Sequence, residues 1–242
     1  SQPVVRALAP AHFPDWYMLE IDTVHHYGAP VAAVIARDKY VAEDAAETIF
    51  VDYEDLPYVG SAEEALAPGA PTVYEDWDDN LILELNFTGG ETPEDATQNT
   101  DEVERILKAS DHRFSQQFKV HRCGATPMEP RGFMAQWDES DGLTLWSTTQ
   151  RPHIERVAIA DLLDLPTAKV RVIHPRDAGG GFGVKAPLYR ETVVVAYAAM
   201  KLGRPVHWQE NRQEHLAVVA QERDQTHHID VGFDKEGRIT AL

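Results

Sequence analysis

The sequence predicts a mixed α+β fold in two regions. A β-α-β pattern fills residues 30–54, and a second strand–turn–helix pattern surrounds the glycine-rich residues 179–183. Between these patterns lies a stretch rich in Pro, Gly, Asp, Glu, Asn and Thr, which is typical of a surface linker because it can bury little apolar area. We therefore expect one region over residues 1–80, a linker over 81–100 and a second region over 101–242.

The first region is expected to contain a crossover unit. Residues 30–36 form an apolar run, which predicts a strand buried on both faces. Residues 38–49 place alanines on one side and acids on the other, as in an amphipathic helix. Residues 50–54 alternate like a strand that ends before Pro57. Two parallel strands joined by the helix would satisfy this pattern, and residues 61–66 add one or two helical turns.

The second region shows helical and alternating patterns in turn. In chain order we expect a helix over 101–109 capped by Thr100, a strand over 112–121, a hairpin of 133–137 with 143–147 around 138–142, and a helix from Pro152 to about Leu163. Beyond these we expect a strand over 170–173, a helix over 189–202 ending at Gly203, a strand over 205–209, a helix over 211–216, and a hairpin of 225–233 with 238–242.

The stretch Gly179-Gly180-Gly181-Phe182-Gly183, here called the glycine turn, connects the 170–173 strand to the helix after it. Glycine lets a backbone approach its neighbour closely, and a strand–turn–helix aims N–H groups at an anion or a cofactor. A dinucleotide loop would need a third glycine where Val184 stands, and a phosphate loop would need one directly before Lys185. The turn matches neither loop. The alternative is a tight turn packed against other backbone.

Charge and cysteine content narrow the class of protein. The formal net charge is −18, which disfavours nucleic acid and anionic membranes as partners. The single cysteine, Cys123, excludes an intrachain disulfide and a four-thiolate zinc or iron–sulfur site. No apolar run reaches membrane-spanning length, so we expect a cytoplasmic protein. Because the chain opens at Ser1 without methionine and stops at Leu242 within a strand pattern, we expect a piece of a longer polypeptide or one subunit of a split one.

Several kinds of site are disfavoured by spacing. Members of the adjacent pairs His25-His26 and His227-His228 would point to opposite faces of a strand. The sequence contains no His-Glu-x-x-His and no Gly-x-Ser-x-Gly, so neither a histidine-ligated metal nor a serine hydrolase is expected. Beside Arg122, Cys123 could be an activated thiolate, but a quiet, half-buried cysteine is the favoured interpretation.

Two further stretches could form a site. The proline-flanked residues 127–132 hold Glu129 and Arg131 close together, and we favour an ion pair between these two that stabilises the turn. Gln150 follows the expected 143–147 strand, at the edge where an α/β layer presents functional groups. The glycine turn follows the 170–173 strand, so we expect Gln150 and Phe182 to come together at this edge. The Gln150 side chain could hydrogen-bond an oxo or hydroxo ligand, or it could cap the helix that begins at Pro152.

Seven stretches together resemble the large, molybdenum-binding subunit of the molybdenum hydroxylases, the family of xanthine dehydrogenase, aldehyde oxidase and carbon monoxide dehydrogenase. Each stretch is weak alone, but they occur in family order over nearly the whole chain. They are residues 27–36 (Tyr-Gly-Ala-Pro-Val-Ala-Ala-Val-Ile-Ala), 51–57 (Val-Asp-Tyr-Glu-Asp-Leu-Pro), 127–132 (Pro-Met-Glu-Pro-Arg-Gly), 147–150 (Ser-Thr-Thr-Gln), 170–185 with the glycine turn, 203–206 (Gly-Arg-Pro-Val) and 211–216 (Asn-Arg-Gln-Glu-His-Leu).

The resemblance implies a fold and a set of site residues. Residues 1–80 would be part of an α/β hammerhead domain, and residues 101–242 would begin a layered α/β molybdenum-cofactor-binding domain. Cofactor-binding residues would be Gln150, Gly180, Gly181, Phe182 and Gly183. The pterin dithiolene supplies the sulfur ligands in this family, so no protein side chain would bind the metal directly, and Gln150 and Phe182 would make outer-shell contacts.

The resemblance also implies a reaction and partners. The family hydroxylates small molecules with water as oxygen source and passes two electrons to [2Fe-2S] and FAD groups, which we expect on an iron–sulfur subunit and a flavin subunit. The cofactor would be molybdenum–molybdopterin in its cytosine dinucleotide form. The general-base glutamate lies downstream of these motifs in the family, so the catalytic residue is expected outside this chain, and this chain alone is expected to be inactive.

The substrate and the class of protein leave alternatives open. Purine-oxidising members resemble one another in a glutamate just after the lysine of the glycine turn, and Ala186 stands there in this chain. Aldehydes, N-heteroaromatics and carbon monoxide therefore stay open as substrates. A non-catalytic assembly module of the same fold is the second hypothesis. An unrelated α/β protein with a fortuitous glycine turn is the third.

Overall fold

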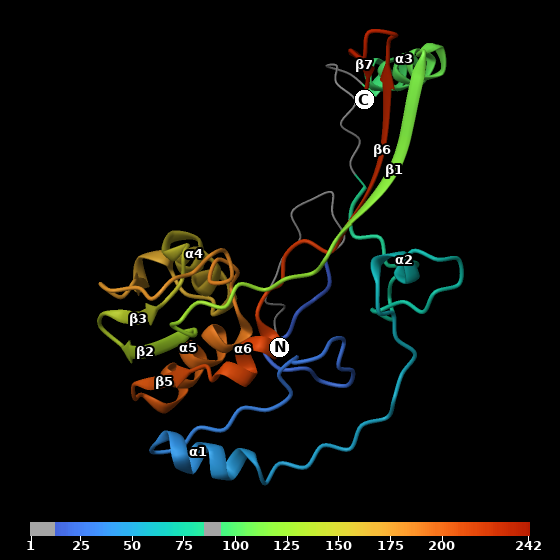
Figure 1. The fold of residues 1–242 in the computed structure, drawn as a ribbon. Coiled ribbons are helices and arrows are strands. Elements are labelled where there is room, and N and C mark those ends of the chain that lie inside the picture. The colour runs from blue at the N-terminus through green and yellow to red at the C-terminus, as the bar shows by residue number, and fades with distance from the viewer. Residues whose placement is uncertain (1–12, 85–92) are drawn as a thin grey trace. The chain divides into compact units, whose positions relative to one another are not determined.

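The structure is a computed structural model that describes residues 13–84 and 93–242. The chain forms two compact units, each built from two separate stretches (Figure 1). The first unit comprises Ser1–Asn80 and Gly124–Gln221, and the second comprises Leu81–Cys123 and Glu222–Leu242.

A four-stranded sheet forms the centre of the first unit. Its strands are β2 (Gly132–Asp138), β3 (Gly142–Ser147), β4 (Val170–Ile173) and β5 (Val206–Gln209), in the order β4-β3-β2-β5. The β2–β3 and β2–β5 pairs are antiparallel, and β3 runs parallel to β4. The helix α4 (Pro152–Leu162) makes the β3–β4 crossover and is followed by a 3-10 turn, Thr167–Lys169. The expected hairpin, helix and strands of this part are confirmed.

The helix α5 (Arg190–Leu202) packs on β2 and β5 and completes the core. Gly203 ends it in the left-handed conformation, with a φ of 58°, as expected from its place after the last helical residue. The short helix α6 (Arg212–Val218) follows β5 and begins with a capping box made by Asn211 and Glu214. The core is formed by apolar residues of the sheet and both longer helices, including Phe133, Ala135, Leu143, Leu145, Ile159, Val170, Val193, Ala196 and Val206.

The second unit is a long antiparallel ribbon with one helix beside it. The strand β1 (His112–Val120) pairs with β6 (Gln225–Phe233), a pairing that the sequence patterns did not predict (Figure 1). The strand β6 also pairs with β7 (Ile239–Ala241), which confirms the expected hairpin. The helix α3 (Pro93–Ala109) packs on β6 and β7. It begins at Pro93, within the stretch predicted to be a linker, so the prediction of a helix capped by Thr100 is wrong. Proline is favoured at the first helical position, where no N–H donor is needed.

The expected crossover unit near the N-terminus is only partly present. The helix α1 (Lys39–Ala46) forms and is capped by Asp38, and α2 (Ala62–Ala65) forms at the second predicted helix. Residues 30–36 and 50–54 lie outside any strand, so the two predicted strands are wrong. An apolar run becomes a strand only when another backbone pairs with it. No described residue supplies that pairing, and Tyr53 is 61% exposed.

Candidate functional site

The glycine turn adopts a backbone that few side chains tolerate. Gly180 and Gly183 have φ values of 101° and 94°, which glycine reaches without penalty. Phe182, between them, has a φ of 52° although it carries a Cβ, and its ring is 71% exposed. A strained, exposed residue held by its surroundings is typical of functional sites.

Gln150 is brought against this turn, as the sequence predicts. Its Oε1 accepts the N–H of Gly183 at 2.9 Å and the N–H of Lys185 at 3.2 Å. Its backbone N–H donates to the carbonyl oxygen of Lys185 at 2.9 Å. Two backbone donors fix which end of the side-chain amide faces the turn, so the Nε2 group faces away from these two N–H groups as a free donor. The alternative, that Gln150 caps α4, is wrong because no side chain caps that helix.

Some N–H donors of this turn and of Gln150 have no partner among the residues that the structure describes. They include the backbone N–H groups of Gly181 and Phe182 and the side-chain Nε2 of Gln150. A Cβ on Gly181 would lie 2.6 Å from the Cδ of Gln150, so the turn and the side chain are in direct contact. Unpaired donors in neighbouring residues of one turn, and in the side chain that contacts it, suit a ligand that carries oxygen acceptors, such as the molybdenum cofactor that the resemblance implies.

The density of glycine has a different cause from the expected one. The sequence interpretation was that the extra glycines make room for a cofactor. A Cβ on Gly179 would lie 2.4 Å from the Cβ of Glu129, and a Cβ on Gly181 would collide with Gln150. Glycine is therefore required at these two positions so that neighbouring side chains of the chain itself can approach. The contact between Gly181 and Gln150 involves two of the residues proposed to bind the cofactor.

The expected ion pair between Glu129 and Arg131 does not form. Glu129 Oε2 lies 2.7 Å from Lys185 Nζ and accepts the N–H of Gly179 at 3.0 Å. Burial opposes the charge of Glu129, but the hydrogen bonds from Lys185 and Gly179 outweigh it and lower the pKa of the carboxyl. Arg131 is 1% exposed and pairs with other acids. A buried guanidinium has five donors, which one neighbouring carboxylate cannot satisfy.

Arg131 lies in a buried cluster of charges under the 127–132 turn. Its Nε donates to Glu210 Oε1 at 2.8 Å and its Nη2 lies 3.1 Å from Glu191 Oε1. The Nδ1 of His215 lies 2.8 Å from Glu210 Oε2, and its Nε2 lies 3.0 Å from the Ala125 carbonyl oxygen. Burial would raise the pKa of Glu210, but the Arg131 hydrogen bonds hold it below its usual value. Sequence reasoning missed this cluster.

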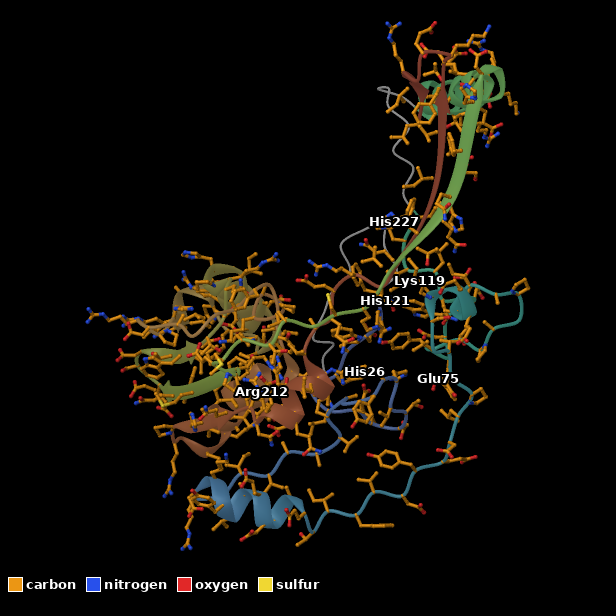
Figure 2. The ribbon with its side chains drawn as sticks, in the orientation of Figure 1. His26, Glu75, Lys119, His121, Arg212 and His227 are labelled. Carbon is orange, nitrogen blue, oxygen red and sulfur yellow. The ribbon has the colours of Figure 1, made fainter. Side chains whose placement is uncertain are left out.

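Arg212, labelled in Figure 2, supports the same turn from α6. Its Nη2 donates to the carbonyl oxygens of Pro127 at 2.8 Å and Met128 at 3.3 Å. Its Nη1 is buried and has no partner among the described residues. A buried guanidinium nitrogen without an acceptor is a second observation that fits an oxygen-rich group beside this turn.

Glu155 is a buried acid that sequence reasoning also missed. It lies in the first turn of α4, is 4% exposed, and its Oε1 accepts the Ser147 hydroxyl at 3.1 Å. Burial is the main influence on its pKa and raises it to about 7, against a smaller lowering by the Ser147 hydrogen bond. The sequence does contain a signal for this burial. Glu155 is four residues before the fully buried Ile159 and therefore lies on the same face of the helix.

The buried carboxyl predicts a pH dependence of stability. In the unfolded chain the Glu155 carboxyl ionises near 4.5, and in the folded chain near 7. The unfolded state therefore binds fewer protons between these values, and the free energy of unfolding falls as the pH rises through them, by about 3 kcal/mol. Glu155→Gln should remove this part of the fall. Denaturant unfolding at several pH values would show it, with the exposed Glu139→Gln as control; parallel profiles for wild type and Glu155→Gln would contradict it.

Other kinds of site are not found in the part of the chain that the structure describes. No group of three or more His, Cys, Asp or Glu side chains there could hold a metal ion. His26 lies in the coil before α1, and His227 lies on β6 (Figure 2). Cys123 is exposed, not half-buried, and its sulfur lies 3.4 Å from Arg223 Nη1. None of the described helices is both long and apolar enough to cross a membrane.

Comparisons with known proteins point to one family. Residues 88–242 match the model of the molybdopterin cofactor-binding domain. Residues 4–57 match the model of the a/b hammerhead domain of aldehyde oxidase and xanthine dehydrogenase. Both models correspond to the fold that the sequence motifs imply.

Individual relatives agree with the family models. The chain is 35% identical over 226 residues to the 6-hydroxypseudooxynicotine dehydrogenase complex subunit gamma of Paenarthrobacter nicotinovorans, covering 93% of this chain and 27% of the relative. It is 34% identical to the carbon monoxide dehydrogenase large chain of Hydrogenophaga pseudoflava, covering 93% and 28%. Quinoline 2-oxidoreductase from Pseudomonas putida 86 superposes with a TM-score of 0.85 at 32% identity, over 96% of this chain and 28% of that one. The chain thus spans little more than a quarter of the length of these relatives.

Proposed function

Since the chain belongs to the molybdopterin-binding subunit family of xanthine dehydrogenase, aldehyde oxidase and carbon monoxide dehydrogenase, we propose that it is the part of a molybdenum hydroxylase in which Gln150 and the glycine turn face the cofactor. One observation carries the proposal. The Gln150 Oε1 accepts the N–H groups of Gly183 and Lys185, so its Nε2 stays available as a donor. The amides of Gly181, which lies against Gln150, and of Phe182 have no partner among the described residues.

Each proposed residue would have a distinct part in holding the cofactor. Gly180 and Gly183 would give the turn its left-handed bends, so that the amides of Gly181 and Phe182 face one side. Gln150 would add its Nε2 donor and lock the turn through Oε1. Molybdenum–molybdopterin, when bound, supplies a two-electron oxidation in which water is the source of oxygen. Preorganised donors of this kind stabilise negative charge on oxygen without reorganising.

The form of the cofactor, the partner subunits, the catalytic base and the domain bounds are proposed as well. We propose the cytosine dinucleotide form of the cofactor, with [2Fe-2S] and FAD groups on an iron–sulfur subunit and a flavin subunit, and a general-base glutamate outside this chain. Several relatives are named as subunits or chains of larger dehydrogenases, which supports such partners. We further propose domains over residues 1–80 and 101–242, connected by residues 81–100, in which α3 begins at Pro93. The cytoplasmic location stays a prediction.

The substrate class is narrowed by Ala186, half-buried directly after Lys185. An apolar methyl group offers no hydrogen bond to a purine, which supports an aldehyde, an N-heteroaromatic or carbon monoxide as the substrate. The second candidate function is a non-catalytic assembly module of the same fold.

The variant Gln150→Glu tests the proposed site. It keeps an oxygen acceptor for the Gly183 and Lys185 amides but replaces the Nε2 donor by a second acceptor. We expect kcat of the full-length enzyme to fall about 10²–10³-fold, the loss typical for removing one preorganised donor, while the melting temperature changes little. An active variant would contradict the assignment of Gln150.

Molybdenum content separates the two candidate functions. We expect one molybdenum atom for each full-length polypeptide in the purified native complex, measured by inductively coupled plasma mass spectrometry with pterin fluorescence beside it. A polypeptide that copurifies with its partners but contains no molybdenum of its own would support the assembly module instead.

A further inference from the structure

A chain of hydrogen bonds leads from the buried carboxyl of Glu155 to the glycine turn. The Ser147 hydroxyl donates to Glu155 Oε1 at 3.1 Å, and its oxygen accepts the N–H of Thr149 at 3.3 Å. The Thr149 hydroxyl in turn donates to the carbonyl oxygen of Lys185 at 3.4 Å and accepts the N–H of Arg151 at 3.1 Å. Gln150 lies between Thr149 and Arg151, in the segment that these hydrogen bonds hold.

The segment between Ser147 and Gln150 is therefore held at both ends. Ser147 and Thr149 are 0% and 4% exposed, so water does not compete for these bonds. The carbonyl oxygen of Lys185 accepts from both the Thr149 hydroxyl and the Gln150 backbone N–H. The position of the Gln150 side chain against Gly183 thus depends on bonds that begin at Glu155.

The state of the Glu155 carboxyl decides whether these bonds are satisfied. Its Oε2 is buried and has no partner among the described residues. A neutral carboxyl leaves one uncharged polar group there without a partner, whereas a carboxylate would place a full charge there with the Ser147 hydroxyl as its one donor among the described residues, which costs far more. An ionised group would need water, and water would reach it only if the first turn of α4 or residues 147–150 moved.

Charged groups on the neighbouring elements do not compensate for Glu155. On α4, Arg156 donates to the carbonyl oxygens of Thr167 and Val170. Two residues after the glycine turn, Lys185 pairs with Glu129, and directly before β2, Arg131 pairs with Glu210 and Glu191. Among the described residues, burial and the Ser147 hydroxyl are the two influences on its pKa, which lies near 7.

We infer that Glu155 is a positioning residue for Gln150, which holds residues 147–150 against the glycine turn while protonated and releases them when ionised. The inference rests on the proposed function, because it bears on the reaction only if Gln150 faces the cofactor. It adds a pH-dependent control of the site within the physiological range.

Hydrogen–deuterium exchange of the full-length protein tests the inference, with fragmentation to separate the amides of Gly183 and Lys185. After correction for intrinsic exchange, we expect their protection in the wild type to fall about tenfold from pH 6 to pH 8, as the ionised fraction of Glu155 rises from about a tenth to about nine tenths. Glu155→Gln keeps an acceptor for Ser147 and should show no such fall. Glu139→Gln, at an exposed turn, should behave as the wild type.

A second variant tests the route of the coupling. Ser147→Ala cuts the link between Glu155 and Thr149 and should lower protection of both amides at pH 6 as well as at pH 8. Any of three outcomes would overturn the inference. They are unchanged protection of both amides in Ser147→Ala, a fall of protection with pH in Glu155→Gln equal to that of the wild type, and protection in the wild type that does not change with pH. Molybdenum content, measured on the same preparations, reports on the proposed function separately: pH-dependent protection without molybdenum would refute the proposed function alone.

Discussion

Glu210→Ala is expected to destabilise the protein by about 3–5 kcal/mol, enough to unfold a marginally stable domain. Glu210 is 2% exposed, and its carboxylate accepts from Arg131 and from His215, both fully buried. Removing it leaves Arg131 with Glu191 as the remaining acid of the cluster and leaves His215 Nδ1 without its partner. Buried polar groups that lose a hydrogen-bond partner carry a desolvation cost without compensation.

Thermal and denaturant unfolding of the purified protein would measure this effect. Glu210→Gln is the matched variant, because it keeps the shape and one acceptor oxygen and should lose less. Glu139→Ala removes an exposed carboxylate and should change stability by no more than about 0.5 kcal/mol. A loss for Glu210→Ala as small as that of Glu139→Ala would show that the cluster contributes little to stability.

The sequence was a good guide wherever a signal is local. Helix ends such as Asp38 and Gly203 carry their own capping chemistry, and the β2–β3 hairpin carries its turn residues, so these were predicted from short windows. The contact between Gln150 and the glycine turn was also predicted, because strand ends and turns of an α/β layer meet at one edge.

The predictions were wrong where a residue or strand pairs with a partner that lies far away in the chain. Glu129 and Arg131 are neighbours in sequence, yet they pair with Lys185 and with Glu210, which come from other elements. Residues 30–36 have a strand pattern, but whether they form a strand depends on a second backbone that pattern analysis cannot supply. Glu155 was missed because its burial follows from the packing of α4.

Gly181→Val is expected to abolish activity of the full-length enzyme while leaving most of its stability. The first atom of the new side chain would lie 2.6 Å from Gln150 Cδ and 2.8 Å from its Oε1, so Gln150 must leave its place. The amides of Gly183 and Lys185 would lose their acceptor, and the Nε2 donor would no longer stand beside the turn. Because Gln150 is exposed, it can swing into solvent, and the fold need not open.

Gly203→Ala is the matched control for backbone effects. Gly203 has a φ of 58° and open space around it, so alanine there should cost about 1 kcal/mol of stability and leave activity intact. A thermal melt, a molybdenum analysis and a rate measurement on the same preparations separate the two substitutions. If Gly181→Val keeps its molybdenum and its activity, Gln150 has no part in the reaction, since the valine and the glutamine side chain cannot occupy the same place.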